Sequence, residues 1–145
     1  MANTLYDYGR QRFLEAQINW MTDTIKVLLV DTGTYTPNTS AHQYLSDISA
    51  TARIAGPVTL TSKRTTGGAA DGADVTFTSV SGPSIEAIVI YKDTGSEATS
   101  PLIAYIDTAT GLPITPNGGD IIVTWDKIFN EISCLVSLSV SPLAA

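Results

Sequence analysis

Three short blocks of β-branched and aromatic residues constrain the fold of this chain more than any other feature. They read Ile-Glu-Ala-Ile-Val-Ile-Tyr over 85–91, Leu-Ile-Ala-Tyr-Ile-Asp over 102–107 and Ile-Ile-Val-Thr-Trp over 121–125, and the gaps between them are rich in Gly, Pro, Asn and Asp. Blocks of this composition, separated by turn residues, are typical of consecutive antiparallel strands. We therefore expect a β-meander in the middle of the core.

The segment 24–31 is the first clear strand along the chain. Apolar residues occupy both of its faces, with Ile25, Val27 and Leu29 on one side and Leu28 and Val30 on the other. A strand that is apolar on both sides is typical of the interior of a sheet with both faces covered.

Four further segments follow this strand along the chain. The segment 53–61 contains Pro57, which has no N–H to donate, so we expect it at a sheet edge or a bulge. The Gly-rich segment 63–73 is expected to be an exposed hairpin tip, and 75–80 alternates as the next strand. A turn or two of helix is expected within 41–48.

An amphipathic helix is predicted over about residues 4–20. Tyr6, Phe13 and Trp20 recur at intervals of seven, and Gly9 lies on their side of the helix. The polar residues Asp7, Gln11 and Glu15 fall on the opposite face. We expect Asn3 or Thr4 to cap it, and the helix either to cover the sheet or to bind a partner. Gly9 weakens it by up to ~1 kcal/mol unless another backbone lies close.

Length and composition indicate one soluble-type domain. The chain has 145 residues, 43% hydrophobic and 15% charged, and a formal net charge of −6 that disfavours nucleic acid as a partner. Charged residues near the N-terminus and the lack of a run of 18 apolar residues lead us to expect neither a signal peptide nor a membrane span. The predicted fold is mainly β, an antiparallel two-layer sandwich or partly open barrel with an N-terminal α-helix, comprising a domain over 1–126 and a C-terminal strand or arm over 127–145.

An Asp-Thr pair with a nearby Gly follows three of the predicted strands. Two copies are the triplets beginning at Asp31 and Asp93, and the third is Asp107-Thr108 with Gly111. Asp side chains accept hydrogen bonds from downstream N–H groups, so these motifs predict a repeated turn. The alternative is an aspartic protease, whose two carboxylates share a proton. The copies lie too close in sequence for two lobes, which favours the turn.

Other candidate chemical sites are weak. His42 is the only histidine, so we expect a polar filler rather than a metal ligand or a catalytic base. Asp71 and Asp74 flank Gly72 but lack the further ligands of a calcium loop. We expect no enzyme activity, no cofactor and no metal site.

Short motifs in both halves of the chain carry a family resemblance. In the first half they are Leu5-Tyr6-Asp7, Phe13-Leu14, Ile18-Asn19-Trp20, Asp23-Thr24-Ile25-Lys26-Val27 and Val30-Asp31-Thr32-Gly33. In the second half they are Ala73-Asp74-Val75-Thr76-Phe77, Ile90-Tyr91-Lys92-Asp93-Thr94-Gly95, Leu102-Ile103-Ala104-Tyr105-Ile106-Asp107 and Asn117-Gly118-Gly119-Asp120. Over roughly residues 3 to 129 the chain resembles a family of small structural proteins of tailed bacteriophages, similar to capsid cement or decoration proteins.

The resemblance implies a structural role on the outer surface of the virion capsid. Such a protein binds the major capsid protein at capsomer junctions and needs no catalytic residues, no nucleic acid and no membrane. By analogy we expect a homo-oligomer, a trimer before a dimer. The alternatives are a tail, fibre or host-surface-binding module, or an unrelated binding domain.

The segment 127–145 departs from the family pattern and is a candidate interface strand. Cys134, Val136, Leu138 and Val140 alternate with serines, with Leu135 the only exception, as expected for an extended strand with one apolar face. The single Cys134 has no partner for a disulfide and suits a buried position. The strand is expected to close the protein's own sheet or to reach a neighbouring subunit or the capsid, with disorder as the third possibility. Pro142 is expected to end the pairing.

Overall fold

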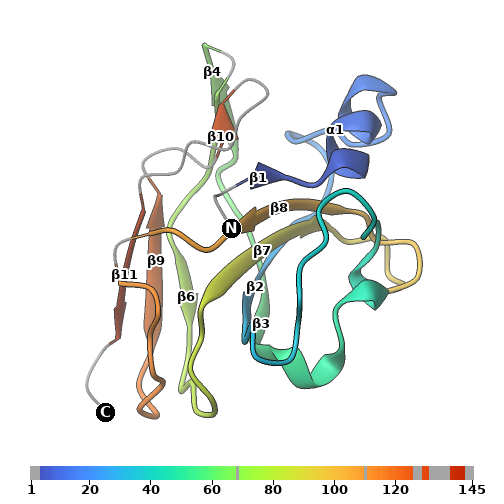
Figure 1. Ribbon diagram of the computed structural model, residues 1–145. Helices are drawn as coiled ribbons and strands as arrows, with labels where there is room; N and C mark the ends of the chain where they lie inside the picture. Colours follow the sequence, from blue (N-terminus) through green and yellow to red (C-terminus); the bar gives the residue numbers. More distant parts are fainter. Residues whose placement is uncertain (1–3, 68, 110, 126–128, 131–137, 143–145) are drawn as a thin grey trace.

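The computed structural model describes residues 4–67, 69–109, 111–125, 129–130 and 138–142, the last two ranges by their backbone alone. The protein is a mainly β sandwich of antiparallel sheets, and the strands within these ranges do not close into a barrel (Figure 1). The largest sheet has five strands in the order β1 (Thr4–Leu5), β8 (Leu102–Ile106), β7 (Ala87–Lys92), β2 (Ile25–Val30) and β3 (Arg53–Thr59).

Two three-stranded sheets complete the β structure. One has the order β11 (Leu138–Pro142), β9 (Ile121–Trp125) and β6 (Val75–Phe77), and it lies to one side of the five-stranded sheet in Figure 1. The other has the order β10 (Phe129–Asn130), β5 (Ala69–Asp71) and β4 (Arg64–Thr66), and it projects at the top of the same view. The helix α1 (Asp7–Leu14) and two 3₁₀ turns, η1 (Leu45–Asp47) and η2 (Ala50–Ala52), pack around the large sheet.

The five-stranded sheet is buried on both faces, as the pattern of β2 predicted. Ile25, Val27 and Leu29 enter a core cluster shared with β6 and β9. Leu28 and Val30 enter a second cluster on the opposite face, which contains residues of the 35–52 segment. All five side chains are fully buried, so the sheet is the middle layer of the molecule.

Pro57 lies on an edge strand, as predicted. β3 is the last strand of its sheet, and its pairing with β2 shifts register between Val27 and Leu29. At Gly56, where φ is +93°, a Cβ atom would lie 2.7 Å from the Val27 carbonyl oxygen. Only glycine therefore fits this irregular turn of the strand.

The predicted meander is only half correct. β7 and β8 pair as neighbours, but β9 pairs with β6 and β11 in a different sheet. The long connection after β8 explains the difference, because within it Ile114 forms a bridge with Ile85 before the chain reaches β9. This connection carries the chain from one layer of the sandwich to the other.

The N-terminal helix is shorter than predicted. Thr4 and Leu5 form β1 and pair with β8, so the N-cap is Tyr6 rather than Asn3 or Thr4. The helix ends at Leu14 because Ala16 takes φ +60°, and the N–H groups of Ala16 and Gln17 donate to the carbonyls of Phe13 and Arg12. This is a Schellman motif. Glycine usually occupies the left-handed position of this motif. Because that position is an alanine here, the sequence gave no signal that the helix ends at this point.

The glycine in this helix permits a close approach to the sheet. A Cβ atom at Gly9 would lie 2.6 Å from the Leu102 carbonyl oxygen and 3.1 Å from the Ile103 Cα. The helix axis therefore lies nearer to β8 than any larger residue would allow. Gly9 was predicted to weaken the helix unless another backbone lay close, and the backbone of β8 does lie close. The helix therefore covers the sheet.

Residues 138–142 belong to the protein's own sheet. β11 pairs antiparallel with β9 from Leu138 opposite Trp125 to Pro142 opposite Ile121. Of the candidate interface strand, Leu138 and Val140 lie on β11, whereas Cys134 and Val136 lie outside the described residues. Pro142 is the last residue of the strand.

Candidate interaction surface

An open apolar hollow of about 450 Å³ lies between the end of α1, the connection to β2 and the β4–β5 hairpin. We call it the apolar hollow; it is lined by Phe13, Ala16, Ile18, Asn19, Trp20, Met21, Thr65, Ala69 and Ala70. Among the described residues, the large hydrophobic side chains that are exposed are Leu14 (88%) and Met21 (50%). Met21 lines the hollow, and Leu14 follows the lining residue Phe13 on α1.

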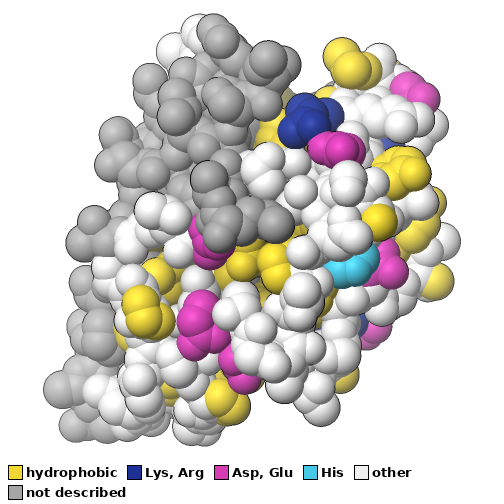
Figure 2. Space-filling view, viewed as in Figure 1, with side chains coloured by type: hydrophobic (Ala, Val, Ile, Leu, Met, Phe, Trp, Pro, Cys, Tyr) yellow, Lys and Arg dark blue, Asp and Glu magenta, His cyan; other side chains and the backbone are white. Residues whose placement is uncertain are grey.

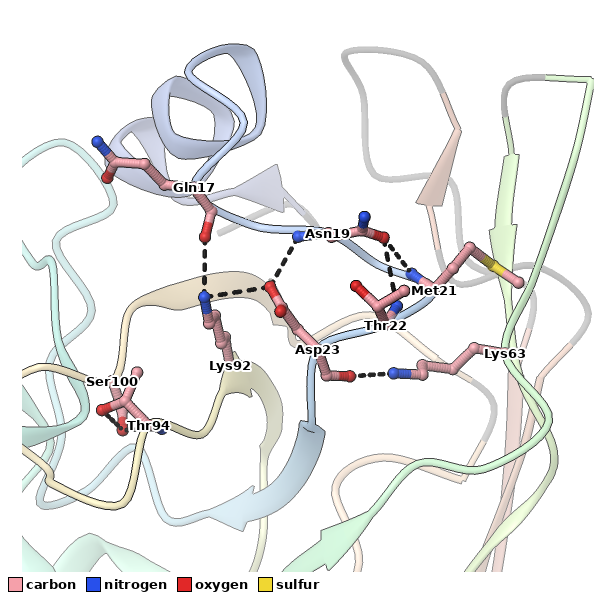
Figure 3. A network of polar contacts seen from close by, with 9 residues as sticks. All are labelled: Gln17, Asn19, Met21, Thr22, Asp23, Lys63, Lys92, Thr94 and Ser100. Carbon is pink, nitrogen blue, oxygen red and sulfur yellow. Dashed lines mark hydrogen bonds and ion pairs between the residues drawn. The ribbon is translucent and has the colours of Figure 1, made fainter.

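A polar network holds the wall of the apolar hollow in place (Figure 3). The Asp23 carboxylate pairs with Lys92 of β7 at 3.1 Å and accepts a hydrogen bond from the Asn19 N–H at 2.7 Å. Lys92 also donates to the Gln17 carbonyl at 2.9 Å, and Lys63 donates to the Asp23 carbonyl. The connection from α1 to β2 is thus fastened both to the large sheet and to the segment before β4.

The opposite wall of the hollow is an edge strand with an exposed side. β4 lies at the end of its sheet, and all three of its residues are exposed. The hairpin is tied to the rest by the Trp20 indole N–H, which donates to the Asp71 carbonyl at 3.2 Å. Arg64 pairs with the Asp71 carboxylate at 2.7 Å across the hairpin. Both walls are therefore held by contacts within the chain.

The acidic side chains dominate the surface charge. Every basic side chain in the part of the chain that the structure describes is engaged internally. Arg10, Lys26, Arg53, Arg64 and Lys92 form ion pairs, Arg12 donates to Gln43 and Tyr44, and Lys63 donates to a backbone carbonyl. Figure 2 accordingly shows more acidic than basic side chains on the face in view.

Asp31 and Asp93 do not form a catalytic pair. β2 and β7 are antiparallel, with Val30 opposite Ala87 and Ile25 opposite Lys92, so the two aspartates follow opposite ends of the paired strands. Asp93 lies beside Thr24, seven residues from Asp31 along β2, so at about 3.4 Å per residue the two aspartates are roughly 24 Å apart. They instead make the predicted turns, because Asp31 accepts from the Gly33 N–H at 2.8 Å and Asp93 from the Gly95 N–H at 3.0 Å.

His42 belongs to a chain of buried hydroxyl groups. Its Nδ1 lies 2.9 Å from the Tyr35 hydroxyl, which is 2.8 Å from the hydroxyl of fully buried Tyr6. Burial raises the pKa of Tyr35 to about 12, and it also raises the pKa of Tyr6 well above its ordinary value. The histidine thus satisfies polar groups inside the structure, and it also accepts from the Asn38 N–H at 3.2 Å.

The described residues contain no group of three or more His, Cys, Asp or Glu side chains arranged to hold a metal ion. Asp71 is engaged by Arg64 and by the Gly72 N–H, which donates at 2.8 Å. Among the described helices, none is long and apolar enough to cross a membrane.

Sequence reasoning did not identify the apolar hollow. The predicted exposed hairpin tip includes Ala69 and Ala70, but both side chains are buried. The predicted helix extends to Trp20, so the prediction gave no role to Met21, the residue directly after it. The available signal was the pair of apolar residues Leu14 and Met21 just outside the amphipathic pattern. Comparison of the chain with protein-family models and with curated proteins finds no match.

Proposed function

We propose that the chain is a structural virion protein of a tailed bacteriophage, a capsid decoration protein that binds the major capsid protein on the outer surface of the shell. The observation that carries the proposal is the apolar hollow, which is lined by Met21 (50% exposed), together with Leu14 (88% exposed), the residue after the lining residue Phe13 on α1. The family resemblance across residues 3 to 129 supplies the partner and the location.

Burial of this surface provides a driving force for binding without chemistry. A Leu or Met side chain that becomes fully buried contributes about 1.5–3 kcal/mol. The walls of the hollow are already held by the Asp23 network and by the Trp20 hydrogen bond. A surface that is ordered before binding loses less conformational entropy when the complex forms.

The charge of the protein supports a basic or polar acceptor surface on the shell. The net charge is −6, and the described cations are engaged within the chain, so the surface keeps an excess of negative charge, to which the exposed Asp74 contributes. Binding should weaken as the Debye length falls from about 10 Å at 0.1 M salt to about 3 Å at 1 M. Occupancy that is unaffected up to about 1 M salt would contradict this part of the proposal.

A closed homo-oligomer, a trimer before a dimer, is part of the same proposal. It is supported by the analogy with decoration proteins at three-fold positions and by Pro57 on β3, which disfavours open-ended pairing of that edge. Sedimentation equilibrium at micromolar concentration tests it, and a monomer that also occupies the shell as single isolated copies would contradict it.

The central experiment measures occupancy on expanded shells assembled from the major capsid protein of the same virus. Leu14→Ser and Met21→Ser are expected to lower occupancy without lowering the melting temperature, because both side chains are exposed. Gln11→Ser, on the outer side of α1, is the matched control and is expected to bind as the unchanged protein does. Equal binding by all variants would refute the role of the hollow. A count of a few copies per virion, rather than hundreds, would refute decoration in favour of a tail or host-binding role.

A further inference from the structure

A second, polar pocket of about 310 Å³ lies beside the large sheet, and its lining shares no residue with that of the apolar hollow. We call it the polar pocket; its lining includes Lys26, Arg53, Tyr91, Asp93, Glu97 and Ser100. Its floor comes from the paired positions Lys26 on β2 and Tyr91 on β7. The turn from Asp93 to Ser100, of which Thr94 and Ser100 appear in Figure 3, forms one wall.

Arg53 is fixed in this pocket by the backbone. Its Nε donates to the Ile48 carbonyl at 3.1 Å, and its Nη2 donates to the carbonyls of Ile48 and Leu45 at 2.6 and 3.0 Å. Only 14% of the side chain is exposed. These contacts hold the guanidinium in one orientation whether or not a carboxylate is present.

The outward edge of Arg53 is occupied by the Glu97 carboxylate. The Nη1–Oε2 and Nη2–Oε1 distances are both 2.9 Å, which is the bidentate geometry of Arg–carboxylate recognition. Glu97 itself is 60% exposed and lies on the turn. Hydrogen bonding to Arg53 lowers the pKa of Glu97. An exposed carboxylate held in this way contributes little to stability and exchanges readily with water.

The pocket also contains an unused donor. Tyr91 is only 2% exposed, and no hydrogen bond joins its hydroxyl to any described residue. The hydroxyl is close enough to Arg53, Asp93 and Glu97 for their charges to act on it, while burial raises its pKa to about 12. Among the described side-chain N and O atoms, Trp125 Nε1 is the one that is fully buried without a hydrogen-bond partner. The Tyr91 hydroxyl is therefore open to the pocket that Tyr91 lines, where it can donate to a ligand or to a water molecule.

When Glu97 is displaced, the charges that remain in the pocket leave room for one negative charge. Asp93 pairs with Lys26 at 2.9 Å and accepts from the Gly95 N–H, so these two opposite charges cancel. Without Glu97, the positive charge of Arg53 would be left over. A carboxylate matches this charge, and a planar carboxylate also matches the fork of the guanidinium.

We propose that the polar pocket is a carboxylate-binding site, in which Glu97 occupies Arg53 until a carboxylate from outside the chain displaces it and also accepts a hydrogen bond from Tyr91. The site does not depend on the proposed decoration function, because it lies on different residues and is testable with the isolated protein.

The test is a titration of the ¹⁵N-labelled full chain with sodium acetate at constant ionic strength, followed by NMR at the Arg53 Nε–H and the Ser96 amide. Glu97→Ala removes the internal competitor and is expected to bind acetate roughly two- to sixfold more tightly than the unchanged protein, because exposed ion pairs are weak. Glu15→Ala, at another exposed glutamate, is the matched control and is expected to change nothing. A blocked glutamate, acetyl-Glu-amide, replaces acetate in a second arm, and its binding would identify a protein side chain as an admissible source.

Two further variants test the roles of Arg53 and Tyr91. In the Glu97→Ala background, Tyr91→Phe is expected to weaken acetate binding roughly tenfold with no loss of melting temperature, since the hydroxyl has no partner among the described residues. Arg53→Lys in that background is expected to abolish the saturable shift. The absence of any saturable shift in Glu97→Ala, equal binding after Tyr91→Phe, or a stronger response to methylammonium than to acetate would each overturn the proposal.

Discussion

Replacing Gly9 by alanine sets two effects of opposite sign against each other. In a helix interior alanine is favoured over glycine by about 0.8–1.0 kcal/mol. The added Cβ, however, would lie 2.6 Å from the Leu102 carbonyl oxygen and 3.1 Å from the Ile103 Cα. Both are backbone atoms of β8, in a sheet whose two faces are packed, so neither moves aside by a change of rotamer. Overpacking typically costs about 1–3 kcal/mol, and a backbone obstacle places Gly9→Ala near the upper value.

We therefore expect Gly9→Ala to lower the free energy of unfolding by about 2 kcal/mol. For a domain of this size that corresponds to a fall in melting temperature of about 4–8 °C. Urea denaturation followed by circular dichroism measures the free energy, and calorimetry measures the melting temperature. Gln11→Ala, on the exposed side of the same helix, is the control and should change stability by less than about 0.5 kcal/mol. If Gly9→Ala proved as stable as the unchanged protein, the close approach of α1 to β8 would not be what glycine provides here.

Three further outcomes are expected. The pKa of Asp93 is lowered because the Gly95 N–H and then Lys26 bind its charged form. The contribution of Asp93 to stability is therefore present above the pKa of the unfolded chain and is lost as pH falls through the folded value. The stability difference between the unchanged protein and Asp93→Asn, measured in urea titrations, should shrink between pH 7 and pH 3. Truncation after residue 126 removes the whole β11 ladder on β9. At roughly 1 kcal/mol per hydrogen bond, it should lower the free energy of unfolding by about 3 kcal/mol or more. Unchanged folding with lost shell binding would mean that the strand pairs with a neighbouring subunit or the shell instead. Asp31→Asn should keep the turn to Gly33 while Asp31→Ala should lose about 1 kcal/mol, and equal stability of the two would argue against the turn.

Local pattern was sufficient wherever the physical cause lies within a few residues. The two-sided apolar pattern of 25–30 placed β2 inside a covered sheet because side chains alternate along any strand. The Asp31 and Asp93 turns followed from the reach of an aspartate side chain to an N–H two residues on. Pro57 went to an edge because it has no N–H to donate.

Tertiary structure decided the features that depend on residues distant in sequence. β9 left the expected meander because Ile114 pairs with Ile85 and turns the chain into the second layer. Ile18 and Trp20 are buried in the core cluster that the large sheet shares with β6 and β9. The chain reaches that core through the left-handed turn at Ala16, which no local propensity favours, and so the helix ends earlier than predicted.

The apolar hollow and the polar pocket also depend on residues that are distant in sequence. The apolar hollow joins α1 to a hairpin some fifty residues later along the chain, and the Arg53–Glu97 pair spans 44 residues. Sequence determined the strands, the turns and the acidic balance, since each is a property of adjacent residues or of their sum. Only the packed chain determined which side chains meet, because the pairing of distant segments depends on the burial of the whole core and not on any one of them.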